Sequence, residues 1–293
     1  MKMEKVRVAF LTYDQLPQIG SDDHQVEMEL LRRGIYVDAV PWKTKDIDWQ
    51  KFDAIVVRSC WDYHLYPEEF IATLNCIDKL PIPVFNPIST ILWNLHKGYL
   101  DALSQQGVIV PKSKLLTRGS SVDLAALIGE EKWTSAVIKP CISASSHNTW
   151  VTTRRTASQD NAALNKLLQH QDLIIQEFVD EICSNGEISL MFFDGTYSHS
   201  VIKKPTPGDF RVQETFGGKT SAYAPRSETI EKAAEILQLV NGELLYARVD
   251  GVEKDGAFCL MELELIEPVL FFRHGPHSAK VFAEAMERLL QKV

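Results

Sequence analysis

The sequence lacks the features that mark a membrane-spanning or nucleic-acid-binding protein. Its 293 residues contain no apolar run that approaches the roughly 20 residues of a transmembrane helix. The formal net charge of −8 disfavours binding to nucleic acid or to an anionic membrane. Internal repeats and low-complexity segments are also absent. We therefore expect neither nucleic acid nor membrane as a partner.

Cysteine is scarce, and its spacing supports neither a disulfide framework nor a zinc site. The five cysteines are odd in number and include no closely spaced pair. This usage is typical of a reducing compartment. The first residues lead directly into an expected strand at 6–12, without the apolar segment of a signal peptide. We therefore expect the protein to be cytoplasmic.

The composition is that of an ordinary globular protein, with 45% hydrophobic and 24% charged residues. The length favours two or three subdomains. Over residues 1–90, expected strands alternate with expected helices, which is typical of an α/β domain with a parallel sheet. The strands are expected at 6–12, 36–42 and 53–59, and the helices at 21–33 and 67–78.

Two further units are expected, at 91–180 and 181–293. The unit at 91–180 contains a helix broken near Gly98, a strand that begins at Gly107, and further strands around a serine-rich loop. The third is a run of hairpins, in which Asp194-Gly195 predicts a tight turn, followed by a closing helix from about residue 276.

The helices at 21–33 and 67–78 allow two interpretations. Each suits a homodimer interface, and each equally suits the role of covering its own sheet.

A polar stripe runs along an apolar hairpin near the C-terminus. Because successive side chains of a strand point to opposite faces, the even positions place Arg248 beside three carboxylates. Like charges this close are unfavourable unless a cation binds them, and oxygen ligands on strands suit Mg²⁺ or Mn²⁺. The carboxylates are Asp250, Glu262 and Glu264, and the expected apolar face carries Leu245, Ala247, Val249, Cys259, Met261, Leu263 and Leu265.

The length of the turn decides whether the two strands of this hairpin carry their carboxylates on the same face. A two-residue turn at Asp255-Gly256 would place Asp250 opposite Met261, on the apolar side. A three-residue turn at 254–256 brings the carboxylates together, so we predict that turn and a metal site. The alternative is an amphipathic hairpin with a solvated acidic face.

Several residues suit a bound nucleotide. Lys139 ends an apolar strand just before the loop 143–147, and an ammonium beside loop N–H groups favours phosphate, although such a lysine is also commonly solvated. The segment 176–178 suits a hinge that meets adenine and ribose. The candidate nucleotide-binding residues are Lys97, Lys139, Ser143, Ser145, Gln176, Glu177, Phe178 and Glu187.

Two segments suit substrate binding. Residues 203–211 are rich in Lys, Arg and Gly and precede Gly217-Gly218, which favours a mobile lid, the alternative being a surface loop. Residues 58–63 follow a strand of the expected parallel sheet, at the end where such sheets bind ligands, or form an aromatic loop cluster. The candidates are Arg211, because arginine binds carboxylate or phosphate bidentately, with Arg58, Asp62, Lys204, Asp209 and Arg273.

Taken in order, these motifs resemble the ATP-grasp superfamily over nearly the whole chain. The strongest resemblance lies in Arg248-Val-Asp250 followed by Glu262-Leu-Glu264. The segments 59–63, 86–94 and 208–218 are most similar to the branch that contains the D-cycloserine-forming cyclo-ligase. Two features depart from the family pattern: Glu264 stands where many members carry Asn, and the loop after Lys139 has no Gly.

The resemblance implies a mixed α/β (α+β) fold in which an α/β pre-domain precedes two α+β lobes that clasp ATP. It implies ATP and Mg²⁺ (or Mn²⁺) as cofactors, a small amino-acid-like substrate, and a carboxylate that is activated as an acyl phosphate and joined to a nitrogen nucleophile. Arg248 and Arg211 are then the candidate catalytic residues. The alternatives are an intramolecular cyclo-ligase, a kinase, and an ATP-binding sensor or scaffold without catalysis.

Overall fold

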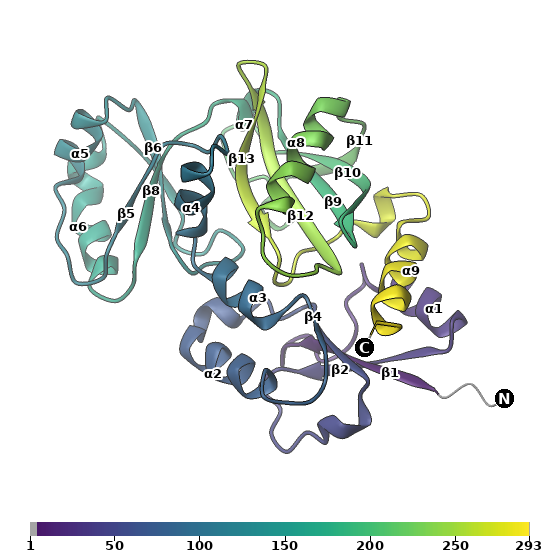
Figure 1. The fold of residues 1–293 in the computed structure, drawn as a ribbon. Coiled ribbons are helices and arrows are strands. Elements are labelled where there is room, and N and C mark those ends of the chain that lie inside the picture. The colour runs from purple at the N-terminus through teal and green to yellow at the C-terminus, as the bar shows by residue number, and fades with distance from the viewer. Residues whose placement is uncertain (1–4, 293) are drawn as a thin grey trace.

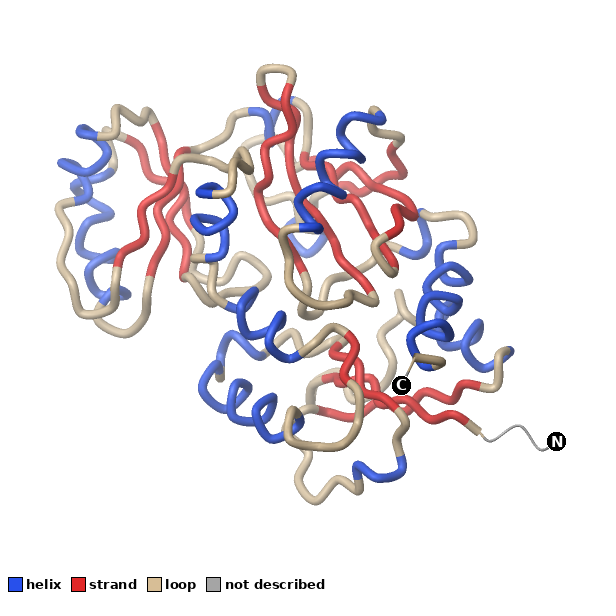
Figure 2. Tube along the Cα trace, in the orientation of Figure 1, coloured by secondary structure: helices blue, strands red, loops and turns tan. Residues whose placement is uncertain are grey.

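Three sheets carry the strands of the computed structural model, which describes residues 5–292 (Figures 1 and 2). The first sheet has the order β2-β1-β3-β4, and all its pairs are parallel, which confirms the prediction for this part of the chain. Its strands are β1 (Val6–Thr12), β2 (Ile35–Pro41), β3 (Ala54–Val57) and β4 (Val84–Phe85).

Helices cover both faces of this first sheet. Successive residues of β1 and β3 face opposite sides of the sheet, and most of those on both sides are apolar and buried, as expected of a parallel sheet covered on both faces. One face packs against α1 (His24–Arg32) and the C-terminal helix α9 (Ser278–Leu290), which lie side by side in Figure 1. The other face packs against α2 (Pro67–Ile77) and α3 (Ile88–Leu95). The chain therefore returns at its end to complete the core of its first unit.

The second sheet is antiparallel, with the order β5-β8-β6-β7. One face is covered by α5 (Leu124–Glu130) and α6 (Ala157–Leu168). The strands are β5 (Ser113–Leu116), β6 (Ser135–Pro140), β7 (Trp150–Thr153) and β8 (Leu173–Glu177).

The prediction that a strand begins at Gly107 is wrong, because β5 starts only at Ser113. Gly107 has φ +90° and ends the preceding helix. The carbonyl of Ile109 accepts a hydrogen bond of 2.8 Å from the Leu260 N–H of the third sheet. This segment therefore connects two sheets before β5 begins.

The third sheet is antiparallel, with the order β11-β10-β9-β12-β13. Helices α4 (Tyr99–Gln105) and α8 (Ser227–Gln238) cover one face, and α3 and α4 are separate helices on either side of Gly98, as predicted. The strands are β9 (Glu187–Phe193), β10 (Thr196–Lys204), β11 (Lys219–Tyr223), β12 (Tyr246–Lys254) and β13 (Ala257–Glu264), and the short helix α7 (Glu181–Ser184) precedes β9.

The turn between β12 and β13 differs from the prediction. Lys254 pairs directly with Ala257, so the turn has two residues, and Asp255 (φ 51°) and Gly256 (φ 80°) both adopt the left-handed conformation that such turns require. The predicted three-residue turn is wrong.

A β-bulge nevertheless brings the carboxylates to one face. The register shifts between Asp250 and Gly251, so that Asp250 pairs with Glu262 while Gly251 pairs with Leu260. Met261 is the extra residue, and a bulge of this kind re-aims the side chains that follow it. As a consequence, Cys259 packs against Val252 instead of joining the predicted apolar face.

Polar side chains bond to the backbone of β13, which is the edge strand of its sheet. The Asn94 amide donates to the Leu263 carbonyl (2.8 Å) and accepts from the Leu265 N–H (3.0 Å). The Tyr99 hydroxyl accepts from the Leu263 N–H (2.9 Å), and the Asn86 amide donates to the Leu265 carbonyl (2.8 Å). These bonds satisfy backbone groups that an edge strand otherwise leaves unpaired.

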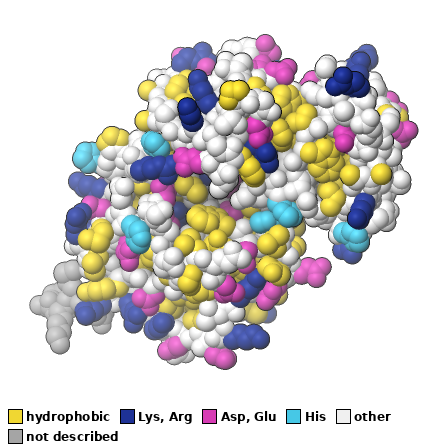
Figure 3. All heavy atoms as spheres, turned by 180° about the vertical axis from the view of Figure 1, so that it is seen from behind, with side chains coloured by type: hydrophobic (Ala, Val, Ile, Leu, Met, Phe, Trp, Pro, Cys, Tyr) yellow, Lys and Arg dark blue, Asp and Glu magenta, His cyan; other side chains and the backbone are white. Residues whose placement is uncertain are grey.

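No helix among residues 5–292 is both long and apolar enough to cross a membrane. On the face shown in Figure 3, basic and acidic side chains are interspersed.

We predict that Asn94→Ala destabilises the protein by about 1–3 kcal/mol, because it leaves the buried Leu265 N–H without a partner and removes one of the two hydrogen bonds to the Leu263 carbonyl, which keeps its bond from the Tyr99 hydroxyl. Denaturant unfolding measures this change. Asn185→Ala is the control, since Asn185 is exposed and its side chain makes no hydrogen bond to the described chain. Equal midpoints for the two variants would contradict the role given to Asn94.

Candidate active site

The three units meet around one cavity of about 410 Å³. The second sheet turns its helix-free face toward it, and the third sheet turns the face opposite α4 and α8, one part of which packs against α9. Lys139 of β6 and Gln176 of β8 therefore lie opposite residues of β12 and β13. The first unit contributes Trp61 and Tyr63 from the loop after β3. A cavity between units with several convergent polar groups is typical of a small-molecule site.

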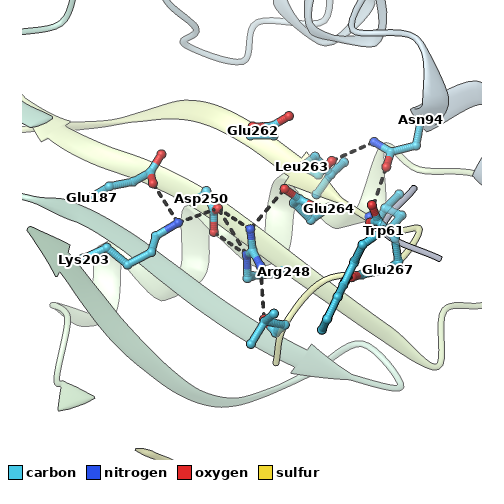
Figure 4. Close-up of polar contacts among 12 residues, drawn as sticks. Trp61, Asn94, Glu187, Lys203, Arg248, Asp250, Glu262, Leu263, Glu264 and Glu267 are labelled. Atoms are coloured by element: carbon cyan, nitrogen blue, oxygen red, sulfur yellow. Dashed lines mark hydrogen bonds and ion pairs between the residues drawn. The ribbon is translucent and has the colours of Figure 1, made fainter. Parts of the chain in front are cut away.

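Arg248 and Asp250 form the centre of the charged cluster on β12. The Arg248 guanidinium donates to Asp250 through Nε (3.0 Å) and Nη2 (2.9 Å), and its Nη2 also donates to Glu264 (3.1 Å), as Figure 4 shows. Asp250 is only 2% exposed. Burial opposes its ionisation, but Arg248 and Lys203 together hold the pKa of Asp250 below its usual range.

Lys203 on β10 bridges two buried carboxylates. Its Nζ lies 2.7 Å from Glu187 and 2.9 Å from Asp250 (Figure 4). The sequence analysis missed Lys203 as a site residue and chose Lys204 instead, but Lys204 is exposed and does not line the cavity. The sequence analysis treated residues 203–211 as a loop, whereas Lys203 lies on β10, where a β-bulge between Tyr197 and His199 places it, and not Ile202, opposite Glu187.

Two lysines approach the cluster from the side of the second sheet. Lys97, between α3 and α4, forms an ion pair of 2.8 Å with Glu262 and donates to the Ser143 carbonyl (3.1 Å). Despite burial, Lys97 and Lys139 lower the pKa of Glu262 to about 2. Lys139 has no carboxylate within ion-pair distance in the described chain, and burial lowers its pKa. Its ammonium therefore lacks the partner that an anionic ligand supplies.

The serine-rich loop and the predicted hinge both reach the cavity. Ser143 and Ser145 line it, and Ser145 and Ser146 adopt the left-handed conformation with φ of 51° and 55°. Gln176 and Glu177 line the cavity as well, and the buried Gln176 Nε2 has no hydrogen-bond partner in residues 5–292. Phe178 does not line the cavity; its ring lies 6.3 Å from that of Phe210.

Most of the residues predicted to bind the substrate do not line the cavity and instead contact other protein groups. Buried Arg58 pairs with Asp23 (2.6 Å), and Asp62 accepts hydrogen bonds from Trp42 and Lys43. Arg273 does not line the cavity itself, but it pairs with Glu214, which does. Arg211 does line the cavity. Its guanidinium lies 2.7 Å from the Asp209 carboxylate and 3.9 Å from the centre of the Phe216 ring. Of the predicted set, Arg211 is thus the one that the cavity includes.

The donor set fits Mg²⁺ in part. Within the described residues, no group of three or more His, Cys, Asp or Glu side chains is arranged to hold a metal ion. The oxygens of Asp250 are bonded by Arg248 and Lys203, so the predicted three-carboxylate site is not formed. Glu262 and Glu264 each use Oε1 in an ion pair, which leaves Oε2 available. Mg²⁺ usually binds one or two carboxylates together with phosphates and waters, which these two residues suit.

Three sheets around such a cavity define the ATP-grasp fold, and comparison with known proteins agrees with the resemblance expected from the sequence. A family model described as the N-terminal domain of D-cycloserine synthetase DcsG matches residues 8–86. The cycloserine biosynthesis protein DcsG of Streptomyces lavendulae is 29% identical over 273 residues, which cover 87% of this chain and 90% of that protein.

Solved structures give the same result. The crystal structure of D-cycloserine synthetase DcsG superposes with a TM-score of 0.87 at 27% identity, covering 97% of this chain and 99% of that one. D-alanine–D-alanine ligase from Bacillus anthracis, in complex with ATP, has a TM-score of 0.67 at 13% identity, with 98% and 99% covered. The ATP-grasp ligase PsnB, with Mg and ADP, has a TM-score of 0.68 at 15% identity, with 99% of each chain covered. The last two share the fold.

We predict that Lys203→Met strengthens nucleotide-free Mn²⁺ binding by about tenfold, or roughly 1.4 kcal/mol. Removing the ammonium leaves the buried Glu187 and Asp250 without their shared cation, and an uncompensated buried charge favours a replacement. Electron paramagnetic resonance of free Mn²⁺ measures the affinity, and a larger rise in Tm with Mn²⁺ than in wild type supports it. Lys204→Met is the exposed control. Unchanged Mn²⁺ affinity in Lys203→Met would show that Lys203 is not the internal counter-ion.

Proposed function

We propose that the protein is an ATP- and Mg²⁺-dependent ligase that activates a small-molecule carboxylate as an acyl phosphate and joins it to a nitrogen nucleophile. One observation carries this proposal: Lys97, Lys139 and Arg248 converge on the same cavity as Glu262 and Glu264. Phosphoryl transfer needs mainly positioning and charge neutralisation, which such a set of cations and carboxylates supplies.

Each part of the cavity has a role in this proposal. Lys97 and Lys139 bind the α- and β-phosphates, and the serine-rich loop covers them with its backbone N–H groups. The hinge at Gln176 and Glu177 holds the adenine, with the unpaired Gln176 amide as one donor. Glu187 contacts the ribose. Glu262 and Glu264 hold Mg²⁺, which when bound neutralises charge on the transferred phosphoryl group.

The reaction balances in two steps. A carboxylate oxygen of the substrate attacks the γ-phosphorus, the bond to the bridging oxygen breaks, and ADP leaves. The nitrogen then attacks the carbonyl carbon, inorganic phosphate leaves with the bonding electrons, and the nitrogen loses a proton. Arg248 faces the developing negative charge, a role in which the loss of one donor typically costs about 3–4 kcal/mol. Arg211 closes over the substrate from the loop 205–213.

The similarity to DcsG over nearly the whole chain favours a second candidate, an intramolecular cyclo-ligase in which one molecule supplies both groups. In D-cycloserine, a ring bond joins the carbonyl carbon to the nitrogen of an aminooxy group. Opening that bond gives O-amino-D-serine, which is therefore the probe for this candidate. The cytoplasmic location and the homodimer interface expected from the sequence remain predictions.

ADP and phosphate release distinguishes these candidates. With ATP and Mg²⁺, O-amino-D-serine alone supports release and yields a cyclic product by mass spectrometry if the reaction is intramolecular. An intermolecular ligase requires a second amine.

In either case, we predict that Glu262→Gln lowers kcat at least 100-fold, because it removes negative charge from the metal site. Glu253→Gln is the matched control, since Glu253 lies on β12 but pairs with Arg226, and Glu253 does not line the cavity. Retained turnover in Glu262→Gln would refute the proposed metal site.

A further inference from the structure

A buried carboxylate on the loop after β13 has no partner from any other residue that the structure describes. Glu267 is 5% exposed and lines the cavity, yet no other described residue forms an ion pair or a hydrogen bond with its side chain. Asp250, Glu262 and Glu264 differ from it, because each is paired with a lysine or an arginine. Burial and the nearby Glu264 raise the pKa of Glu267 to about 8. A buried acid of this kind favours a cation brought by a ligand.

The backbone around Glu267 is held rigidly. The Trp61 indole N–H donates to the Glu267 carbonyl (3.1 Å), and the Tyr246 hydroxyl donates to the Ile266 carbonyl (2.7 Å). The Arg248 Nη1 donates to the Val269 carbonyl (3.1 Å). Figure 4 shows Glu267 beside Trp61, at the end of the charged cluster away from Glu187 and Lys203. A side chain on such a fixed loop is suited to positioning a ligand.

The surroundings of Glu267 suit an organic cation better than a metal ion. Trp61 and Tyr63 line the same cavity, and after burial the negative charge of Glu267 is the largest influence that raises the pKa of Tyr63. Aromatic rings attract ammonium groups, whereas Mg²⁺ requires an octahedron of oxygen ligands. An ammonium group offers three N–H donors, which match the unpaired carboxylate oxygens.

We propose that Glu267 is the residue that binds the protonated α-amino group of the amino-acid substrate, so that this side chain selects an α-amino acid over the corresponding hydroxy acid. This inference rests on the proposed ligase function. It assigns the recognition of the amino group to the loop after β13, while Glu262 and Glu264 serve the nucleotide and its metal.

The test compares two acids that differ only at the α-position, O-amino-D-serine and O-amino-D-glyceric acid, with ADP release as the readout. The wild type is expected to prefer the amino acid by at least 100-fold in kcat/KM. Glu267→Gln is expected to lower kcat/KM for the amino acid at least 30-fold, mainly through KM, and to reduce the preference below tenfold. Calorimetry with AMP-PNP and Mg²⁺ is expected to give the same affinity for both proteins, and Glu253→Gln again serves as the control.

Three results would overturn the inference. Equal use of the two acids by the wild type would show that no group recognises the ammonium. A parallel loss of AMP-PNP and Mg²⁺ affinity in Glu267→Gln would place Glu267 in the metal site. Use of neither acid by a wild type that binds AMP-PNP with Mg²⁺ would reject this substrate class and leave the ligase proposal intact. Absence of AMP-PNP binding to the wild type is the distinct result that would reject the proposed function itself.

Discussion

The structure depends on the neutralisation of buried carboxylates by cations that come from different elements. Arg248 on β12, Lys203 on β10 and Lys97 before α4 each bond an acid of the same cavity. Without these partners, burial alone would oppose ionisation of the acids. The cations therefore hold the site together before any ligand is present. Under the proposed function, binding of nucleotide and Mg²⁺ is an exchange of partners, in which phosphate binds the lysines and the metal binds carboxylate oxygens.

A rigid frame of backbone hydrogen bonds keeps these charges in place. Asn86, Asn94 and Tyr99 bond the edge of β13, so the strand that carries Glu262 and Glu264 is fixed from the side of the preceding helices. On the other side, Arg248 and Trp61 hold the loop that follows β13. The cavity thus lies between groups contributed by all three units.

The sequence predicted the parallel sheet of the first unit and the break at Gly98, because hydrophobic periodicity and helix-breaking residues report local geometry. It also predicted the common face of Asp250 and Glu262, although through the wrong turn. It did not predict the two β-bulges. Both hairpins have two-residue Asp-Gly turns, and in each a bulge changes the pairing further along the strands. The pairing of Lys203 with Glu187 was therefore not predicted, and the turn was wrongly predicted to span residues 254–256. Arg58 failed as a substrate residue because its partner Asp23 is distant in sequence. Glu267 was missed because an unpaired acid is recognisable only once its surroundings are known.

We propose that ATP binds at the carboxylates of β13 together with Mg²⁺. The decisive experiment is isothermal titration of ATP into the wild type and Glu262→Gln, each with and without Mg²⁺. We expect micromolar binding to the wild type that requires Mg²⁺ and is lost in the variant. Binding that is independent of both Mg²⁺ and Glu262, or no binding to the wild type, would contradict it.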